Sequence, residues 1–377
     1  MPADDRFRVT YLIVAGDEKT ARERAVAVAY EQTVEVPDDV VPDGYIRDEI
    51  VGQVETIEHT DDGRWRTTIA YSPDSAGHEV IQLLNVMFGN SSIQQGIAVE
   101  GFEPGPVISE RFGGARFGVQ GLRKLTGTKR GGLISPVIKP QGSSAAELAN
   151  IASRCVAGGA DIIKDDHGLT NQTMAPFAYR LKIVGDAVHE ANAKHGRSSL
   201  YFINISGWSG NPVQEAHQAK EAGAGGVLIM PGLLGYALAH RLSSDPDFEL
   251  PIMTHPSFTG PFVLNAETGM SHAMMYGTVQ RLMGSDISVF PNVGGRFGFS
   301  REECLSIADA CRASKGIGQP MMPSPGGGMS VDRAADMVEM YGEDVVYLIG
   351  GSLLRAGDGI GDAVKAMRDA VDAALSV

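Results

Sequence analysis

The spacing of apolar and polar positions changes repeatedly along the first third of the chain. Strand-like runs such as FRVTYLIVA and RWRTTIAYS alternate there with stretches of helical period such as EKTARERAVAVAYEQ and HEVIQLLNVMFG. A period of two predicts strands, and a period of three to four predicts helices. We therefore expect residues 1–125 to form an α+β N-terminal domain.

From about residue 131, short apolar runs end in Gly, Pro or polar residues and are followed by amphipathic stretches. The runs are GLISPVIKP, ADIIKDD, LYFINISG, GGVLIMPG, PIMTHPS, ISVFPNVGG, QPMMPSPGGG and VVYLIGGS. Eight runs over about 245 residues match the length and periodicity of a (β/α)8 TIM barrel, and an open doubly wound sheet is the alternative. We expect residues 126–377 to form this barrel as the catalytic domain.

Three of the predicted helices carry start signals. Ser144 with Glu147 and Ser300 with Glu303 have the spacing of capping boxes, and Asn211 precedes a proline. These signals place helices after the first, third and sixth apolar runs.

Composition and charge narrow the class of function. The chain has 377 residues, of which 43% are hydrophobic and 21% charged, as in ordinary soluble globular proteins. The net charge of -14 would repel nucleic acids and anionic lipids, so we expect neither as a partner. No apolar stretch reaches the roughly 18 residues of a membrane span, and the three cysteines form no CxxC pair. A cytoplasmic enzyme with reduced thiols fits best, and an anionic substrate would need a local basic pocket.

In a barrel, the active site is built where the strands end, at the C-terminal face. Polar residues at these ends are Lys139, then Lys164, Asp165, Asp166 and His167, then Asn204, His255 and, in the loop after the sixth run, Arg296. Two adjacent aspartates beside a lysine and a histidine suit Mg²⁺ if the lysine carries a carboxylate. The alternative is a solvated hydrophilic turn.

Late glycine runs predict a phosphate site, because barrels commonly bind phosphate with backbone N–H groups after strands seven and eight. The candidate substrate-binding residues here are Ser324, Gly326, Gly327, Gly328, Gly350 and Gly351. Lys139 directly follows an apolar strand, where desolvation would favour the neutral amine of a general base; a surface lysine is the alternative. His255 is either a hydrogen-bonded structural residue or a member of the site.

Taken together, GLISPVIKPQG, GGADIIKDDHG, LPIMTHPSFTG and the late GG runs resemble the ribulose-bisphosphate carboxylase superfamily, and more closely its RuBisCO-like proteins of form IV. The resemblance covers nearly the whole chain. It implies that Lys164 carries a CO₂-derived carbamate and holds Mg²⁺ with Asp166 and His167. It also implies that Lys139 handles the proton of an enolisation.

Softer matches extend the resemblance to the N-terminal third. Glu31 and Asn90 look like residues that a neighbouring subunit contributes to the active site, which implies a homodimer or a larger assembly. His255 matches the histidine of the fifth strand, and Arg296 lies where the family has a mobile-loop lysine that holds a carboxylate.

Departures from the carboxylase pattern bear on the reaction. His167 replaces a metal-binding glutamate, and Gln141, expected to bind substrate, replaces a second active-site lysine. Pro256 stands where the carboxylase has an arginine of its second phosphate site. Val289 stands near the position of the histidine of that site. The resemblance therefore implies a non-carboxylating enzyme that acts on a small phosphorylated keto-sugar or keto-sugar acid.

Three functions are compatible with these residues. The first is a lyase that decarboxylates a β-keto sugar-acid phosphate such as 3-oxo-isoapionate 4-phosphate, with Arg296 holding the carboxylate. The second is an isomerase or enolase of methionine salvage, acting on a substrate of the 5-methylthioribulose 1-phosphate type, with an apolar wall in place of the second phosphate site. The third is a barrel without catalytic activity.

Overall fold

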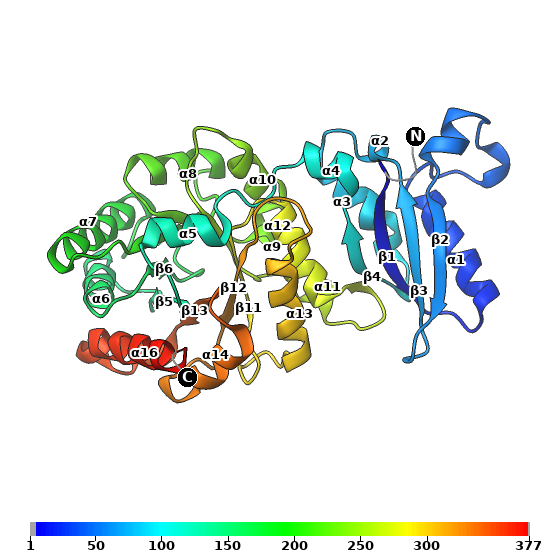
Figure 1. The fold of residues 1–377 in the computed structure, drawn as a ribbon. Helices are drawn as coiled ribbons and strands as arrows, with labels where there is room; N and C mark the ends of the chain where they lie inside the picture. Colours follow the sequence, from blue (N-terminus) through cyan, green and yellow to red (C-terminus); the bar gives the residue numbers. More distant parts are fainter. Residues whose placement is uncertain (1–4, 376–377) are drawn as a thin grey trace.

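A computed structural model describes residues 5–375. Its N-terminal part is a five-stranded sheet in the order β10-β4-β1-β3-β2, which lies to one side of a barrel (Figure 1). The strands are β1 (Phe7–Ile13), β2 (Gln53–His59), β3 (Trp65–Tyr71), β4 (Ile97–Glu103) and β10 (Gly269–Met270). The helices of this part are α1 (Glu18–Glu31), α2 (Pro73–Ala76), α3 (Val80–Phe88) and α4 (Gly105–Arg111). The predicted α+β architecture is confirmed.

The remainder forms a closed barrel of eight parallel strands in the order β11-β12-β13-β5-β6-β7-β8-β9. The strands are β5 (Leu133–Ile138), β6 (Ile162–Asp165), β7 (Leu200–Asn204), β8 (Gly226–Ile229), β9 (Ile252–Thr254), β11 (Ile287–Pro291), β12 (Met322–Gly326) and β13 (Val346–Ile349). Each predicted run contains one strand, so the TIM barrel is confirmed and the open sheet is excluded.

Helices surround the barrel in the expected alternation. They are α5 (Gly118–Thr126), α6 (Ala145–Ala157), α7 (Phe177–His195), α8 (Pro212–Glu221), α9 (Pro231–Leu234), α10 (Ala237–Ser244), α11 (Gly260–Val263), α12 (Val279–Leu282), α13 (Arg301–Arg312), α14 (Ala334–Tyr341), α15 (Gly351–Leu354) and α16 (Ile360–Ala374). Both capping boxes are formed, and Asn211 accepts a hydrogen bond from the backbone N–H of Gln214. The predicted boundary between the two domains, at residue 125, falls within α5. This boundary remains a prediction.

Alternation along the strands decides which side chains enter the barrel. In β5, Leu133 and Val137 belong to the interior cluster, whereas Ile134 and Ile138 pack in the layer beneath the helices. Val119 and Leu122 of α5 join the interior cluster. The barrel is therefore a packed core, and the polar residues that follow the strands surround its C-terminal mouth.

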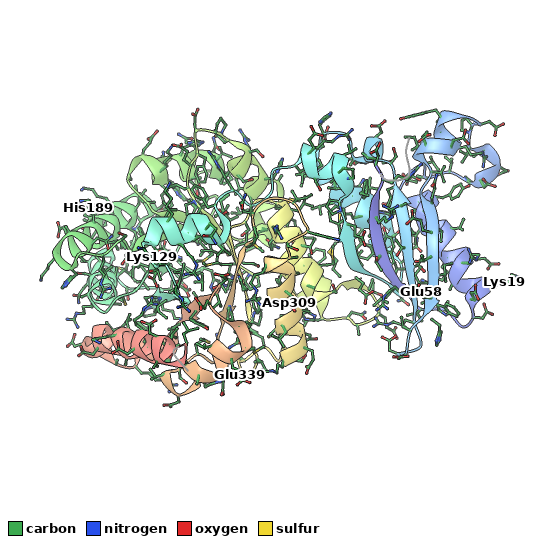
Figure 2. The ribbon with its side chains drawn as sticks, in the orientation of Figure 1. Lys19, Glu58, Lys129, His189, Asp309 and Glu339 are labelled. Carbon is green, nitrogen blue, oxygen red and sulfur yellow. The ribbon has the colours of Figure 1, made fainter. Side chains whose placement is uncertain are left out.

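Charged side chains such as Lys19, Glu58 and Lys129 project from the outer surface (Figure 2). Cys155, Cys304 and Cys311 are buried and free. Within residues 5–375, no helix combines the length and the apolar character that crossing a membrane requires.

Candidate active site

A cavity of about 1070 Å³ opens where the barrel strands end. Eleven of the predicted site residues line it: Lys139, Lys164, Asp166, His167, His255, Arg296, Gly326, Gly327, Gly328, Gly350 and Gly351. They come from six different strand ends, far apart in the sequence. The barrel therefore brings together residues that we predicted only from their positions at the ends of strands.

The polar residues at the end of β6, the second strand of the barrel, lie on two faces of the sheet. Lys164 and Asp166 line the cavity, whereas Asp165 points outward and is fully buried. The Asp165 carboxylate accepts hydrogen bonds from Arg180 Nε at 3.0 Å and from the Tyr201 hydroxyl at 2.9 Å. The expectation that both adjacent aspartates supply ligands is therefore wrong for Asp165, because neighbouring side chains of a strand face opposite ways.

Lys164 is the one lysine buried inside the barrel among the described residues. Its Nζ donates to the backbone oxygen of Asp165 at 2.7 Å. Burial lowers the pKa of Lys164 to about 8, although the charges of Asp166 and Asp165 oppose this shift. A neutral amine is thus accessible near neutral pH, and a neutral amine is the form that reacts with CO₂.

The donor set fits a magnesium ion only if Lys164 is modified. Within residues 5–375, no three His, Cys, Asp or Glu side chains are grouped so as to hold a metal. A carbamate on Lys164 would add oxygen ligands beside Asp166, and hard oxygen ligands are what Mg²⁺ prefers. His167 lies next to them, with its Nδ1 3.8 Å from Asp166 Oδ1.

Lys139 lies beside Asp166 and Gly350. Its Nζ is 3.9 Å from Asp166 Oδ1, and a Cβ placed on Gly350 would lie 3.1 Å from the same nitrogen. The side chain is 31% exposed, so it is less desolvated than its position after an apolar strand predicted. Lys139 can therefore reach a substrate in the cavity while its amine rests close to the backbone of the last strand.

Two imidazoles stack in the cavity. The rings of His167 and His255 have centroids 4.1 Å apart and planes inclined by 18°. Burial lowers the pKa of His255 well below its usual value, and the charges of Lys164 and His167 add to this shift. His255 Nδ1 accepts a hydrogen bond from the backbone N–H of Ser257 at 3.3 Å and lies 2.9 Å from its hydroxyl. The neutral ring therefore carries its hydrogen on Nε2.

Glycines and a further arginine contribute to the cavity lining. Gly327 and Gly328 have φ angles of 95° and 64°, which only glycine adopts readily. Arg355 lines the same cavity, and our interpretation of the sequence missed it because it lies beyond the last strand's glycine pair. Ser324, predicted to bind substrate, is buried behind the cavity lining, and its Oγ has no hydrogen-bond partner within residues 5–375.

The lining also includes apolar side chains. They belong to Pro256, Phe258, Val263, Leu264, Val289 and Phe297. Phe258, Leu264 and Phe297 are 72%, 71% and 63% exposed, and Phe258 has a φ of 67°, unusual for a bulky residue. No sequence pattern indicated Phe258 and Phe297, because each lies in an irregular loop.

Three more predicted residues, besides Ser324, lie outside the cavity lining. Gln141 is exposed beyond the end of β5. Glu31 and Asn90 lie in the N-terminal domain, where Asn90 Nδ2 donates at 2.9 Å to Oε1 of Glu31 and to Oε1 of Glu35. The latter pair is therefore not part of the site formed by its own chain.

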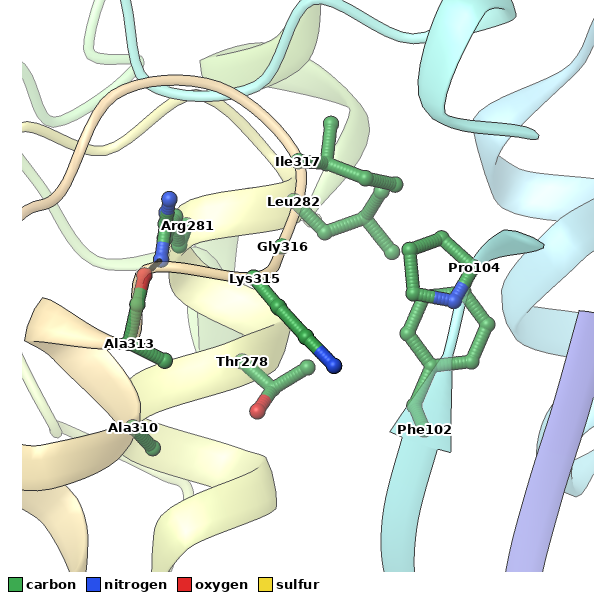
Figure 3. A pocket seen from close by; sticks show the side chains of 10 residues that line it. All are labelled: Phe102, Pro104, Thr278, Arg281, Leu282, Ala310, Ala313, Lys315, Gly316 and Ile317. Atoms are coloured by element: carbon green, nitrogen blue, oxygen red, sulfur yellow. Dashed lines mark hydrogen bonds between the residues drawn. The ribbon is translucent and has the colours of Figure 1, made fainter. Parts of the chain in front are cut away.

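A second, smaller cavity of about 130 Å³ lies between the N-terminal sheet and the barrel. Lys315 extends into it toward Phe102 and Pro104 (Figure 3). Its lining has no carboxylate or imidazole, whereas the lining of the larger cavity has both.

Comparison with known proteins gives a consistent set of relatives. Residues 118–376 match the family described as ribulose bisphosphate carboxylase large chain, catalytic domain. Ribulose bisphosphate carboxylase-like protein 1 of Rhodopseudomonas palustris is 37% identical over 95% of both chains. A 5-methylthioribulose-1-phosphate isomerase of Rhodospirillum rubrum is 34% identical over 99% of this chain and 98% of its own.

Solved structures agree with these matches. The crystal structure of the Rubisco-like protein from Rhodopseudomonas palustris has a TM-score of 0.85 at 36% identity and covers 98% of both chains. Octameric Rubisco from Pyrococcus horikoshii has a TM-score of 0.90 at 25% identity, covering 100% of this chain and 89% of its own.

Proposed function

Because this chain belongs to the ribulose bisphosphate carboxylase large-chain family, among its non-carboxylating RuBisCO-like proteins, we propose that it transfers a proton within a phosphorylated ketose that has an apolar end. A substrate of the 5-methylthioribulose 1-phosphate type has both features. The proposal takes up the second function considered from the sequence, and it is supported by the isomerase that is 34% identical over nearly the whole chain.

The observation that carries this proposal is the composition of the cavity lining. Glycine backbone and Arg355 can bind one phosphate, whereas Phe258, Leu264 and Phe297 can contact an apolar group but offer nothing to a second phosphate. A substrate with one phosphate and one apolar end matches both kinds of surface, and a bisphosphate does not.

The chain's own groups suit carbon-acid chemistry. Lys139 takes the proton from the carbon next to the carbonyl and returns it to the former carbonyl carbon. The hydroxyl proton of the first carbon passes to the former carbonyl oxygen, so the carbonyl moves by one carbon. Neutral His255 donates a hydrogen bond through Nε2 to a substrate oxygen and holds the carbon skeleton over Lys139. Carbamylated Lys164, Asp166 and His167 would hold Mg²⁺, which supplies stabilisation of negative charge on the substrate oxygen.

Decarboxylation of a 3-oxo-isoapionate 4-phosphate type substrate is the second candidate. It has one supporting observation, since Arg296 lines the cavity and can pair with a carboxylate. However, its guanidinium carbon lies 5.5 Å from the centre of the Phe297 ring, so the arginine rests against the apolar surface. We therefore rank the proton transfer first.

Incubation in deuterated water tests the two candidates together. The protein, Mg²⁺ and bicarbonate are mixed with 5-methylthioribulose 1-phosphate or with 3-oxo-isoapionate 4-phosphate. We expect deuterium incorporation and isomerisation of the first compound, detected by NMR, and no CO₂ release from the second. CO₂ release at a higher kcat/KM would contradict our proposal, and inactivity toward both would favour the barrel without catalytic activity.

The site also has a proposed partner. We infer that Glu31 and Asn90 enter the active site of a second copy of the chain, since they do not line their own cavity. An assembly of at least two subunits agrees with the octameric state named for Pyrococcus horikoshii Rubisco.

A further inference from the structure

The segment between β6 and α7, residues 166–176, carries both Asp166 and His167. It lacks a regular helix or strand that would pair its backbone groups. Buried carbonyl oxygens need partners, and side chains supply several of the donors here. The identity of those donors shows what fixes the position of the two side chains.

Asn204, at the end of β7, supplies two of them. It is fully buried, and its Nδ2 donates to the backbone oxygens of His167 at 3.0 Å and Leu169 at 2.8 Å. Both hydrogens of the amide are thereby used. One side chain on a barrel strand thus fixes the backbone on both sides of Gly168.

Arg180, in the first turn of α7, supplies three more, and Gln172 Nε2 donates to the backbone oxygen of Gly168 at 2.7 Å. Arg180 Nη1 donates to the backbone oxygens of Thr170 and Ala175, both at 2.7 Å, and its Nη2 to that of Leu169 at 3.4 Å. The guanidinium is fully buried, and its Nε pairs with Asp165 at 3.0 Å. The outward-facing aspartate therefore orients the arginine that holds the loop.

The clamped backbone in turn orients Asp166. The backbone N–H of Gly168 donates to Asp166 Oδ2 at 3.0 Å, so Oδ1 is left to face Lys139 and His167. Displacement of Gly168 would turn the carboxylate and change which oxygen faces the cavity.

We propose that Asn204 and Arg180 are positioning residues, which fix the loop so that Asp166 and His167 face the cavity, where Mg²⁺ and the substrate would bind. The expected effect on catalysis rests on the proposed function, whereas the positioning of the loop rests on the hydrogen bonds alone. Groups that orient metal ligands from behind commonly change affinity or activity by about 10–100-fold when they are removed.

Asn204→Ala tests this proposal, with Asn192→Ala as a matched control. The Asn192 side chain also makes two hydrogen bonds to backbone, both with Ser199 at 2.9 Å, but it lies near the end of α7, away from the cavity. The two variants therefore lose the same number of bonds. Urea unfolding verifies that their losses of stability are similar.

Three readouts separate positioning from folding. For Asn204→Ala we expect Mg²⁺ affinity in bicarbonate buffer to fall about 10-fold or more. Amide hydrogens of residues 166–170 should exchange faster, and kcat for 5-methylthioribulose 1-phosphate should fall about 10–100-fold while KM changes little. Asn192→Ala should leave all three unchanged.

Unchanged Mg²⁺ affinity and kcat in Asn204→Ala, or equal losses in Asn192→Ala, would overturn the inference. If Asn204→Ala does not fold, Arg180→Lys replaces it, because lysine keeps the charge facing Asp165 but cannot bridge the three carbonyls. If the unaltered protein does not turn over the ketose, the proposed function fails, whereas Mg²⁺ binding and hydrogen exchange still decide the role of Asn204.

Discussion

At the scale of single residues, Lys139 is the group on which the proposed proton transfer depends. We expect Lys139→Ala to abolish exchange of the substrate's carbon-bound proton with deuterated water, because no other amine lies beside Asp166 at the cavity wall except buried Lys164. Phosphate binding should persist, so the Kd of the substrate should change little. NMR of the substrate measures the exchange.

Lys129→Ala is the control for Lys139→Ala, since Lys129 is exposed, does not line the cavity and precedes β5, whereas Lys139 follows it. If Lys139→Ala raises KM but turns over bound substrate at the normal rate, Lys139 is a binding residue. In a decarboxylase, the same change would spare loss of CO₂ and mainly impair protonation of the product.

Gly350 lies beside Lys139 and belongs to the proposed phosphate site. A Cβ there would lie 3.1 Å from Lys139 Nζ, whereas a Cβ on Gly351 would meet nothing within 4 Å. We therefore expect Gly350→Val to lower kcat by displacing the lysine and to raise KM by crowding the phosphate, while Gly351→Ala changes kcat little. Steady-state kinetics on the ketose measures both. Equal effects on kcat at the two glycines would contradict this.

The residues of the site were predictable to the extent that they follow strands. The position of Lys164 and Asp166 follows from the period of two, and the same period would have placed Asp165 outside. Phe258 and Arg355 were not predictable, because the path of an irregular loop depends on contacts with residues distant in the sequence.

At the scale of elements, Asp286 connects α5 to the strands of the barrel. Its buried carboxylate accepts hydrogen bonds from the backbone N–H groups of Phe117, Gly118 and Ile252 at 2.7, 2.8 and 3.0 Å. In Asp286→Asn the amide would face one of these donors. We expect a loss of about 1–3 kcal/mol in the free energy of unfolding.

The loss in Asp286→Asn should depend on pH. Burial raises the pKa of Asp286 to about 6, so the folded protein holds this proton more tightly than the unfolded chain does. The stabilisation from this group is greatest below about pH 4 and decreases as the pH rises through about 6. The difference between the two proteins in urea unfolding should therefore shrink from pH 4 to 6. A difference that grows with pH would show that the hydrogen bonds outweigh burial.

The elements themselves were largely predictable. Each of the eight barrel strands has an apolar run with a clear end, and the helices after β5, β7 and β11 have caps in the sequence. Strand β10 was not predictable, because it has two residues and pairs with Ala98 and Val99 of β4. A pairing so distant in sequence leaves no local pattern.

At the scale of the whole molecule, the position of Glu31 requires explanation. Its carboxylate and that of Glu35 share the Asn90 amide on the N-terminal domain, outside the cavity of the same chain. In a two-fold dimer, a residue that reaches the partner's site does so in both directions. Each site would then combine Lys139 of one chain with Glu31 of the other.

Mixed dimers test this arrangement. Glu31→Gln and Lys139→Ala should each be nearly inactive, since every site of either homodimer lacks one group. When the two variants are unfolded, mixed and refolded together, half of the dimers are mixed, and each mixed dimer has one intact site. Recovery of roughly a quarter of the original activity is expected. If both groups belonged to one chain, every site would remain defective and mixing would restore nothing. Size-exclusion chromatography with light scattering would verify that the refolded material is dimeric or larger.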